Sequence, residues 1–479
     1  MLNIKKGTSF NTYRTGGHSS VVERLVANEK VEGSTPFARS ILMKNIANSK
    51  VKEILKLAFQ KQKEKRFYEA IVHYENVIKI DPSIVFAYYN LGLVYVELGN
   101  VDQAKKNFQQ AIKVNPLFIY SYVNLGILFQ NQGQKEKAIE CFEKVIEVDP
   151  KNISGYNNLG LVYASLGNYK KALNNYLKTL SIENSNIIAI KSIIFLLTYY
   201  VPDNDHPIIN ANNELRLLTQ DHTLTNLLMT ENLSLIIKNS IKILNQISID
   251  IDKLNFTETQ SYRRNTLDLN CDYHHKVFYH SNIIPKFCFS CFKIQIEPEN
   301  VIDLIRLFFI FDDLNLPKNN QRKCMVEFRN EVAGLYKGMI YCSSLEEAKK
   351  ILDELRSVLE TNLKCKVSIK RGCSEFYNSF PTYKVIESDK KDFMTYNQDW
   401  EEIEENLKLK KNFNTIKLNN SISGLSVADS LIIIQWLNYA KIVGDTTYKE
   451  MDVNFFNSKF IENQLLNQVE LRKKELINI

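Results

Sequence analysis

Cysteines are the residues of this 479-residue chain whose type and spacing could do chemistry, and there are eight of them. Cys288 and Cys291 have the C-x-x-C spacing with which two thiolates bind one tetrahedral metal ion. Three more cysteines follow and could supply the remaining ligands: Cys324, Cys342 and Cys373. We therefore predict a structural zinc site on these residues. An iron–sulfur cluster would use the same ligands and is the second choice of cofactor.

Two other interpretations of the cysteines stay open. Four of them share the alternation of the apolar residues around them, which favours thiols packed in a core: Cys288, Cys324, Cys342 and Cys373. The other is redox or disulfide use, but a thioredoxin-like site is excluded because the C-x-x-C pair precedes a predicted strand instead of opening a helix. Three upstream histidines could replace a cysteine as metal ligand: His274, His275 and His280.

The elements that must position these cysteines follow one another in the order β-α-β-β-α-β within residues 287–376. Alternating apolar and polar residues predict strands at 292–297, 323–329, 336–342 and 364–371, with helices after the first and third strands. This order resembles a ferredoxin-like split βαβ sandwich. In such a sheet the first two strands start at the edge where the last two end. We therefore expect the five cysteines to meet at one edge.

The sheet face away from the predicted helices carries basic residues: Lys293, Lys323, Lys337, Lys366 and Lys370. Such a face can bind RNA only with exposed aromatic residues for stacking, and Tyr341 alone qualifies. We therefore expect a solvated face, or one covered by the C-terminal segment, and do not predict nucleic acid as a partner.

Sequence motifs for catalysis are missing from the chain. There is no glycine-rich phosphate loop after a strand, no nucleophile elbow and no H-E-x-x-H. A binding protein is therefore favoured over an enzyme. The alternative is a metal- or thiol-dependent enzyme, or a redox protein, that recruits a protein substrate through its N-terminal half.

A 34-residue period occupies that N-terminal half, in the segments 51–84, 85–118, 119–152 and 153–186. The second segment shows the full pattern: Tyr88, Leu91, Gly92, Tyr95, Ala104, Phe108, Ala111 and Pro116. The large residues fill the space between two helices, the small ones let the helices approach, and the proline ends the second helix. The pattern is identified as that of tetratricopeptide (TPR) repeats. The resemblance implies a solenoid of four helix-turn-helix repeats with a capping helix from Ile187.

The resemblance also places the first helix of each repeat along a concave groove. Asn90, Asn124 and Asn158 occupy the same position of that helix, similar to the asparagine ladder of TPR superhelices that grip peptides. The alternative is that asparagine is simply common at this position. The neighbouring positions lack the Lys and Arg of a clamp for acidic chaperone tails: Tyr89, Val123, Asn157, Leu93, Ile127 and Leu161. The expected partner is an apolar or neutral segment of another protein, or the C-terminal half of this chain. The apolar helix near 426–443 is expected to be a core element packed on the sandwich, and its apolar character would also suit docking in the groove.

The chain as a whole is predicted to be α+β, with a TPR solenoid (51–201), a helical linker region (202–286), a ferredoxin-like domain (287–376) and a C-terminal helical extension (377–479). Residues 1–42 resemble a translated transfer-RNA gene and are predicted to be a mis-annotated or disordered extension. The composition is that of an ordinary globular protein, with 44% hydrophobic and 24% charged residues. We find no apolar stretch long enough to cross a bilayer and no export signal, so we predict a cytoplasmic protein with reduced cysteines.

Overall fold

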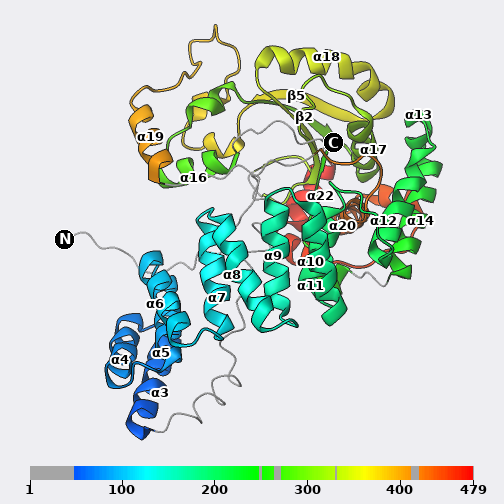
Figure 1. Cartoon of the computed structure of the whole chain (residues 1–479). Helices are drawn as coiled ribbons and strands as arrows, with labels where there is room; N and C mark the ends of the chain where they lie inside the picture. Colours follow the sequence, from blue (N-terminus) through cyan, green and yellow to red (C-terminus); the bar gives the residue numbers. More distant parts are fainter. Residues whose placement is uncertain (1–47, 248–250, 264–270, 330–331, 411–419, 478–479) are drawn as a thin grey trace.

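A computed structural model describes residues 48–247, 251–263, 271–329, 332–410 and 420–477. The predicted extension 1–42 lies outside these residues, so that prediction is untested. Figure 1 shows a row of paired helices in chain order, followed by a part built around a five-stranded sheet. We call these two parts the repeat stack (α3 to α10) and the sheet unit (α11 to α22).

The repeat stack consists of four helix pairs, one for each predicted repeat. These are α3 (Ser49–Lys63) with α4 (Phe67–Ile80), α5 (Val85–Glu97) with α6 (Val101–Val114), α7 (Ile119–Asn131) with α8 (Lys135–Val148), and α9 (Ile153–Ser165) with α10 (Tyr169–Ile182). The predicted capping helix follows as α11 (Ile187–Leu196).

Glycines explain why each pair is tight. Gly99, Gly133 and Gly167 lie in the turns between paired helices with φ of 73°, 74° and 73°, the left-handed region that glycine enters at little cost. A Cβ built on Gly92 would lie 2.6 Å from the ring of Phe108 on the partner helix. The small residue at this position therefore allows the close approach of the two helices.

The helices after the capping helix are α12 (Pro207–Gln220), α13 (Leu224–Leu227), α14 (Thr230–Gln246) and α15 (Ile251–Leu254). Arg216 on α12 donates hydrogen bonds to the carbonyl oxygens of Leu197, Ile422 and Ser423, which ties α12 to segments far away in the sequence. One hydrophobic core combines α10 to α14 with the sheet and the C-terminal helices. The predicted boundaries at 202, 287 and 377 therefore fall inside one core.

The sheet has the strand order β1-β3-β4-β2-β5, and all neighbouring strands are antiparallel. The strands are β1 (Gln260–Arg263), β2 (Phe292–Pro298), β3 (Arg322–Val326), β4 (Tyr336–Cys342) and β5 (Cys365–Arg371). Between them lie α17 (Val301–Asp313), after β2, and α18 (Leu345–Asn362), after β4. An antiparallel sheet with helices is thus present where the sequence predicts it. The short edge strand β1 is additional.

Helices α17 and α20 (Val427–Val443) lie on the same side of the sheet. A Cβ on Gly338 of β4 would press on Leu307 of α17, and Tyr336, two residues earlier on β4, packs against Tyr439 of α20. Helix α20 is buried along its length, with the indole of Trp436 donating to the carbonyl of Thr259. The apolar helix predicted near 426–443 is therefore a core element of the sheet unit.

A small aromatic lobe continues the sheet unit beyond the start of β2. It contains α16 (Cys271–Ser281), the short 3-10 turns η2 (Lys286–Ser290), η3 (Ser374–Phe376) and η4 (Pro381–Lys384), and α19 (Trp400–Lys410). Figure 1 shows α16 and α19 together at one end of the sheet. The chain ends with η5 (Thr446–Met451), α21 (Lys459–Leu465) and α22 (Val469–Ile477). Among the described residues, no helix combines the length and apolarity needed to span a membrane.

Candidate functional site in the repeat stack and at the cysteine edge

The three asparagines of the predicted ladder recur on the first helices of repeats two, three and four, as expected. Each side-chain amide donates to the carbonyl four residues earlier in its own helix: Asn90 to Phe86 at 2.8 Å, Asn124 to Tyr120 at 2.9 Å and Asn158 to Ser154 at 2.9 Å. Asn90 and Asn158 are buried, with 3% and 2% exposure, and Asn124 is half-buried.

These bonds correct one part of the prediction. Each amide uses one N–H inside its own helix. The second N–H of Asn124 donates to the hydroxyl of Tyr89 and that of Asn158 to the hydroxyl of Ser154, so these two amides have no N–H left for a peptide. No described residue donates to the Oδ1 of Asn90, Asn124 or Asn158. What the ladder offers a peptide is therefore a row of acceptors for backbone N–H groups.

Tyr89 and Asn157, the other two predicted groove residues, are held inside the stack. The amide of Asn157 donates to Asn186 at 3.3 Å, and its oxygen accepts from the hydroxyl of Thr179 at 3.0 Å. Tyr89 is 1% exposed and its hydroxyl accepts from Asn124 at 3.3 Å. These two residues join neighbouring repeats, and a peptide would not reach them as first contacts.

An aromatic cluster beside Asn124 was not predicted. Phe118 packs against Phe86 and Tyr120 with ring centroids 5.1 Å and 5.4 Å apart, and Tyr89 completes the cluster. Phe86 and Tyr120 are half-buried and occupy equivalent positions of α5 and α7, one repeat apart. The 34-residue period could have revealed this pair, because the second position of each first helix faces the same way. Asn124 with Phe86 and Tyr120 forms what we call the groove patch.

The cysteine edge is only partly assembled as predicted. Cys342 ends β4 directly opposite Phe292, and the amide of Gly372 donates to the carbonyl of Cys291 at 2.7 Å, which brings Cys373 to the same edge. Cys288 lies in the adjoining turn, where its carbonyl accepts from the hydroxyl of Tyr383.

Cys324 does not join this edge. It pairs with Gly338, four residues before Cys342 on β4, and lies in the core beneath α17. We predicted Cys324 at the edge because it lies near the start of its strand. However, β3 is shifted along β4, so that Cys324 pairs with Gly338 and not with Cys342.

The remaining thiols are divided between the two sides of the sheet. Cys342 belongs to the core under the helices, whereas Cys291 precedes Phe292 and so points to the opposite face, and Cys288 and Cys373 pack in the aromatic lobe. Among the described residues, no group of three or more His, Cys, Asp or Glu side chains lies close enough to hold a metal ion. The prediction of zinc or an iron–sulfur cluster gains no support from this geometry and stays a prediction.

The upstream histidines whose side chains are described do not belong to a group of metal-binding residues either. His274 is buried and packs edge-on against Phe376, and His280 is exposed near the end of α16. The side chain of His275 lies outside the described residues.

Burial makes the edge thiols poor nucleophiles. Removal from water raises the pKa of Cys342 and of Cys373 to about 12, and raises the pKa of Cys291 as well. Because the thiolate is the reactive form, these groups react slowly at neutral pH. The geometry thus favours packing over thiol chemistry.

The lysine face differs from the expectation of a solvated surface. Lys293, Lys323 and Lys337 are 6%, 6% and 1% exposed, whereas Lys366 at the β5 edge is exposed. Lys337 is neutralised by Glu327 at 3.0 Å, and Arg329 makes two further bonds to the same carboxylate at 2.9 Å. Helix α20 does not cover this face, since it lies on the other side of the sheet with α17.

Comparison with known proteins identifies the repeat stack. Tetratricopeptide repeat models match residues 85–118, 119–152 and 141–174, and a TPR repeat model matches 63–99. Residues 63–174 are therefore TPR repeats, as predicted, and a protein-interaction scaffold is the function that such repeats support.

Solved structures similar to this chain include other repeat proteins. The crystal structure of MamA is 29% identical over 29% of this chain and 81% of its own, with a TM-score of 0.28. The first TPR of Spaghetti (RPAP3) bound to HSP90 peptide SRMEEVD is 21% identical over 26% of this chain and 97% of its own, with a TM-score of 0.24. PilW, a type IV pilus biogenesis factor, is 17% identical over 43% and 82%, with a TM-score of 0.29. These TM-scores are too low to carry an argument. No curated protein matches the chain.

Proposed function

We propose that this protein is a scaffold whose TPR repeats bind an extended, uncharged segment of a partner protein across α5 and α7. The observation that carries the proposal is the groove patch. There, Asn124 has a side-chain oxygen to which no described residue donates, and its amide is bonded to Tyr89 of the aromatic cluster that contains the half-buried rings of Phe86 and Tyr120. A peptide N–H can donate to that oxygen while an apolar side chain packs on the rings.

The location of the C-terminal half supports an external partner over the alternative of self-binding. Helix α20, the most apolar C-terminal segment, packs against α12, α14, α17 and the sheet. Docking this helix in the repeat groove would first require extracting Trp436 and its neighbours from the core, which costs several kcal/mol. The chain's own C-terminal half is therefore the second candidate occupant.

The test is selection of random peptides on the full-length protein, followed by calorimetric affinities of the selected peptides. We expect uncharged peptides with apolar residues, bound at least about tenfold more weakly by the Phe86→Ala/Tyr120→Ala variant, because two ring contacts are lost. Tyr68→Ala is the matched control, because this tyrosine lies on α4 and is 78% exposed.

Two outcomes would contradict the proposal. Selected peptides that are acidic at their C-terminus would indicate a different kind of groove. Equal affinities for the double variant and for Tyr68→Ala would move the binding surface away from the groove patch.

For residues 287–376 we propose the ferredoxin-like arrangement. In chain order the elements are β2, α17, β3, β4, α18 and β5, and the order β3-β4-β2-β5 across the sheet supports this proposal. A structural metal at the cysteine edge is a separate proposal. Its support is the C-x-x-C spacing, and it would require thiols on both sides of the sheet to draw together. The cytoplasmic location stays a prediction.

A further inference from the structure

Two lysines on the lysine face are buried without a counter-charge. Lys293 on β2 and Lys323 on β3 are each 6% exposed. Among the described residues, neither ammonium forms an ion pair, and Lys293 also has no hydrogen bond. Lys323 is hydrogen-bonded only to the neutral side chain of Gln260, at 3.2 Å, and lies over the ring of Tyr262. Buried ammonium groups are normally paired, because removing a charge from water is costly.

The sheet register brings both lysines to the same face. Lys293 lies directly opposite Tyr341 on one side and Lys370 on the other. In the next row across the sheet, Lys323 lies opposite Met339. Residues that pair across antiparallel strands share a face, so Lys293 and Lys323 lie on the same face, on the two strands that flank β4. The ammonium of Lys323 lies on the β1 side of its strand, where it bonds to Gln260.

The nearest carboxylates are engaged elsewhere. Glu327 binds Lys337 and Arg329, and Glu375 lies 3.4 Å from Arg329. The thiol beside Lys293 does not supply a negative charge either, since burial raises the pKa of Cys373 to about 12 and the thiol stays protonated at neutral pH. Two positive charges are therefore left over on this face.

The pKa of Lys323 shows the effect of Lys293. Burial and the charges of Lys293 and Arg329 lower the pKa of Lys323 to about 8, so it still holds its proton at pH 7. Burial would lower the pKa of Lys293 as well, but nearby acidic groups, Glu375 among them, raise it above the usual value. Both groups are charged at neutral pH, and the repulsion between them is relieved when an anion binds between them.

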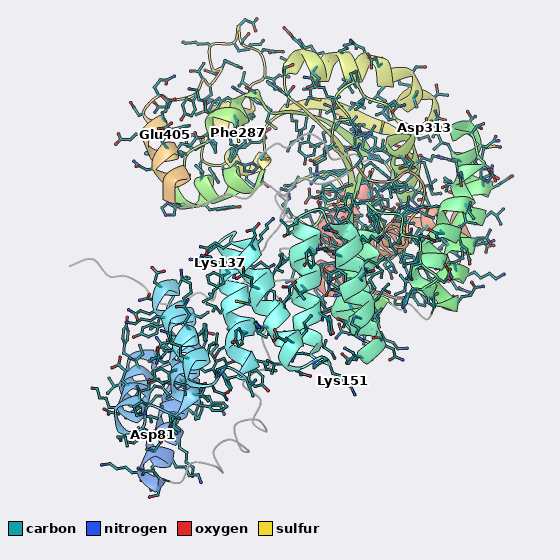
Figure 2. All side chains as sticks on the ribbon, in the orientation of Figure 1. Asp81, Lys137, Lys151, Phe287, Asp313 and Glu405 are labelled. Atoms are coloured by element: carbon teal, nitrogen blue, oxygen red, sulfur yellow. The ribbon has the colours of Figure 1, made fainter. Side chains whose placement is uncertain are left out.

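Both rows of residues reach the β5 edge of the sheet. The row that contains Lys293 ends at the half-buried Lys370, and the row that contains Lys323 and Met339 continues through Gln295 to Ser368, which is exposed. Lys370 thus adds a third basic residue beside Lys293. In Figure 2 the part of the molecule that contains Phe287 and Asp313 lies away from Asp81 in the first repeat. The two lysines lie on β2 and β3, so this surface is on other elements than the groove patch on α5 and α7.

We propose that the lysine face holds a phosphate dianion, as inorganic phosphate or as the phosphate group of a small monoester, between Lys293 and Lys323. A phosphate carries close to two negative charges at pH 7, which matches the two uncompensated ammonium groups, whereas a carboxylate would neutralise only one. The site does not depend on the groove patch and adds a small-molecule ligand to the proposed scaffold.

The experiment is calorimetric titration of the full-length protein with inorganic phosphate, with O-phosphoserine and with acetate, at pH 7 and low ionic strength. We expect saturable phosphate binding that is tighter than acetate binding. Lys293→Met and Lys323→Met should each weaken phosphate binding at least about tenfold, because each removes one charged hydrogen bond. Lys366→Met is the matched control, because this lysine is on the same face but exposed, and it should bind phosphate like the unchanged protein.

Unfolding of the same variants without phosphate shows that they are folded. Replacing an unpaired buried ammonium with an apolar side chain should leave Tm unchanged or raise it. Tighter binding of O-phosphoserine than of phosphate would identify the ligand as a monoester, and the reverse order as the free ion. The proposal is overturned if phosphate binds no better than acetate, or if both lysine variants, folded, bind phosphate as the unchanged protein does.

Discussion

The repeat stack and the sheet unit are held together in different ways. In the stack, the hydrophobic clusters join only helices that are neighbours in the sequence, first α3 to α5, then α5 to α8, then α8 and α9. In the sheet unit, one cluster combines residues as far apart as Ala189 and Leu465, and it also includes α10, the last helix of the stack. A change in the stack should therefore weaken the repeats that contain it, whereas a change in the sheet unit should weaken the whole unit.

The two parts also differ in how deeply their ion pairs are buried. The close pair Arg66–Glu69 of the stack, at 2.6 Å, has both side chains about half exposed. In the sheet unit, Arg263 is 2% exposed and lies 2.9 Å from Asp429 and 2.7 Å from Asp312. Exposed pairs contribute little to stability, while breaking a buried pair leaves an uncompensated charge in the core. Electrostatic changes should thus matter mainly in the sheet unit.

The largest effect is expected from Arg263→Met. This change leaves the carboxylates of Asp312 and Asp429 in the core without the positive charge of Arg263. It should lower the free energy of unfolding of the sheet unit by about 3–5 kcal/mol. Urea titration followed by near-ultraviolet circular dichroism measures it, and Arg66→Met is the control in the stack, with a change below about 1 kcal/mol. Equal effects of the two variants would show that the buried pair is not an anchor of the sheet unit.

Acid should destabilise the sheet unit before the stack. Burial alone would raise the pKa of Glu327, but hydrogen bonds from Arg329 and the charge of Lys337 lower it to about 2. Because the pKa of Glu327 is lower in the folded protein than in the unfolded chain, the ionised carboxylate stabilises the fold above about pH 4.5. This stabilisation is lost as pH falls toward 2. It corresponds to about 3 kcal/mol. Unfolding curves between pH 6 and pH 2 measure it, and Glu327→Gln should flatten that dependence. An unchanged slope in this variant would assign the acid sensitivity to other carboxylates.

A smaller effect is expected from Gly92→Ala in the stack. The added Cβ would lie 2.6 Å from Phe108, so α5 and α6 must separate, at a cost of about 1–3 kcal/mol. Gly99→Ala is the control, because its surroundings are open and only the positive φ of 73° is unfavourable, at about 1 kcal/mol. Thermal unfolding should show both losses in the repeats and leave the sheet-unit transition in place. A loss of the sheet-unit transition in Gly92→Ala would mean that the two parts unfold together.

The smallest effect is expected from removing metal. If the edge thiols, divided between the two sides of the sheet, only pack in the core, a chelator should shift Tm by no more than about 1 °C, and Cys288→Ser/Cys291→Ser should remain folded. Elemental analysis of protein purified without chelator measures zinc and iron directly. About one zinc per chain, lost together with folding in the double variant, would instead establish the structural metal.

Much of the repeat stack could be predicted from the sequence, because each repeat is defined by residues fewer than 34 positions apart. Gly99 in the turn and Gly92 against Phe108 act locally, so their spacing alone indicated the helix pairs. The strands β2 to β5 could be predicted for a similar reason, since their alternation is visible in single segments. The ladder of Asn90, Asn124 and Asn158 was placed correctly, but the bonds that its amides make to carbonyls four residues back were not foreseen.

Other features depend on contacts that no local pattern reveals. Strand β1 is short and polar, and its Ser261 and Arg263 are buried only because Asp429, more than 160 residues later, accepts their hydrogen bonds. The position of Cys324 depends on the register between β3 and β4, and a shift of a few residues moved it from the edge to the core.

The sequence by itself determined the TPR repeats and the order of the strands β2 to β5 along the chain, because these follow from the period of apolar and small residues within short segments. Only the tertiary structure decided which faces are covered. It placed α20 in the core instead of the repeat groove, separated the thiols onto two sides of the sheet, and buried Lys293 and Lys323 without an ion pair to any described residue. The physical reason is that burial and charge compensation depend on residues far apart in the chain, and these are brought together only by folding.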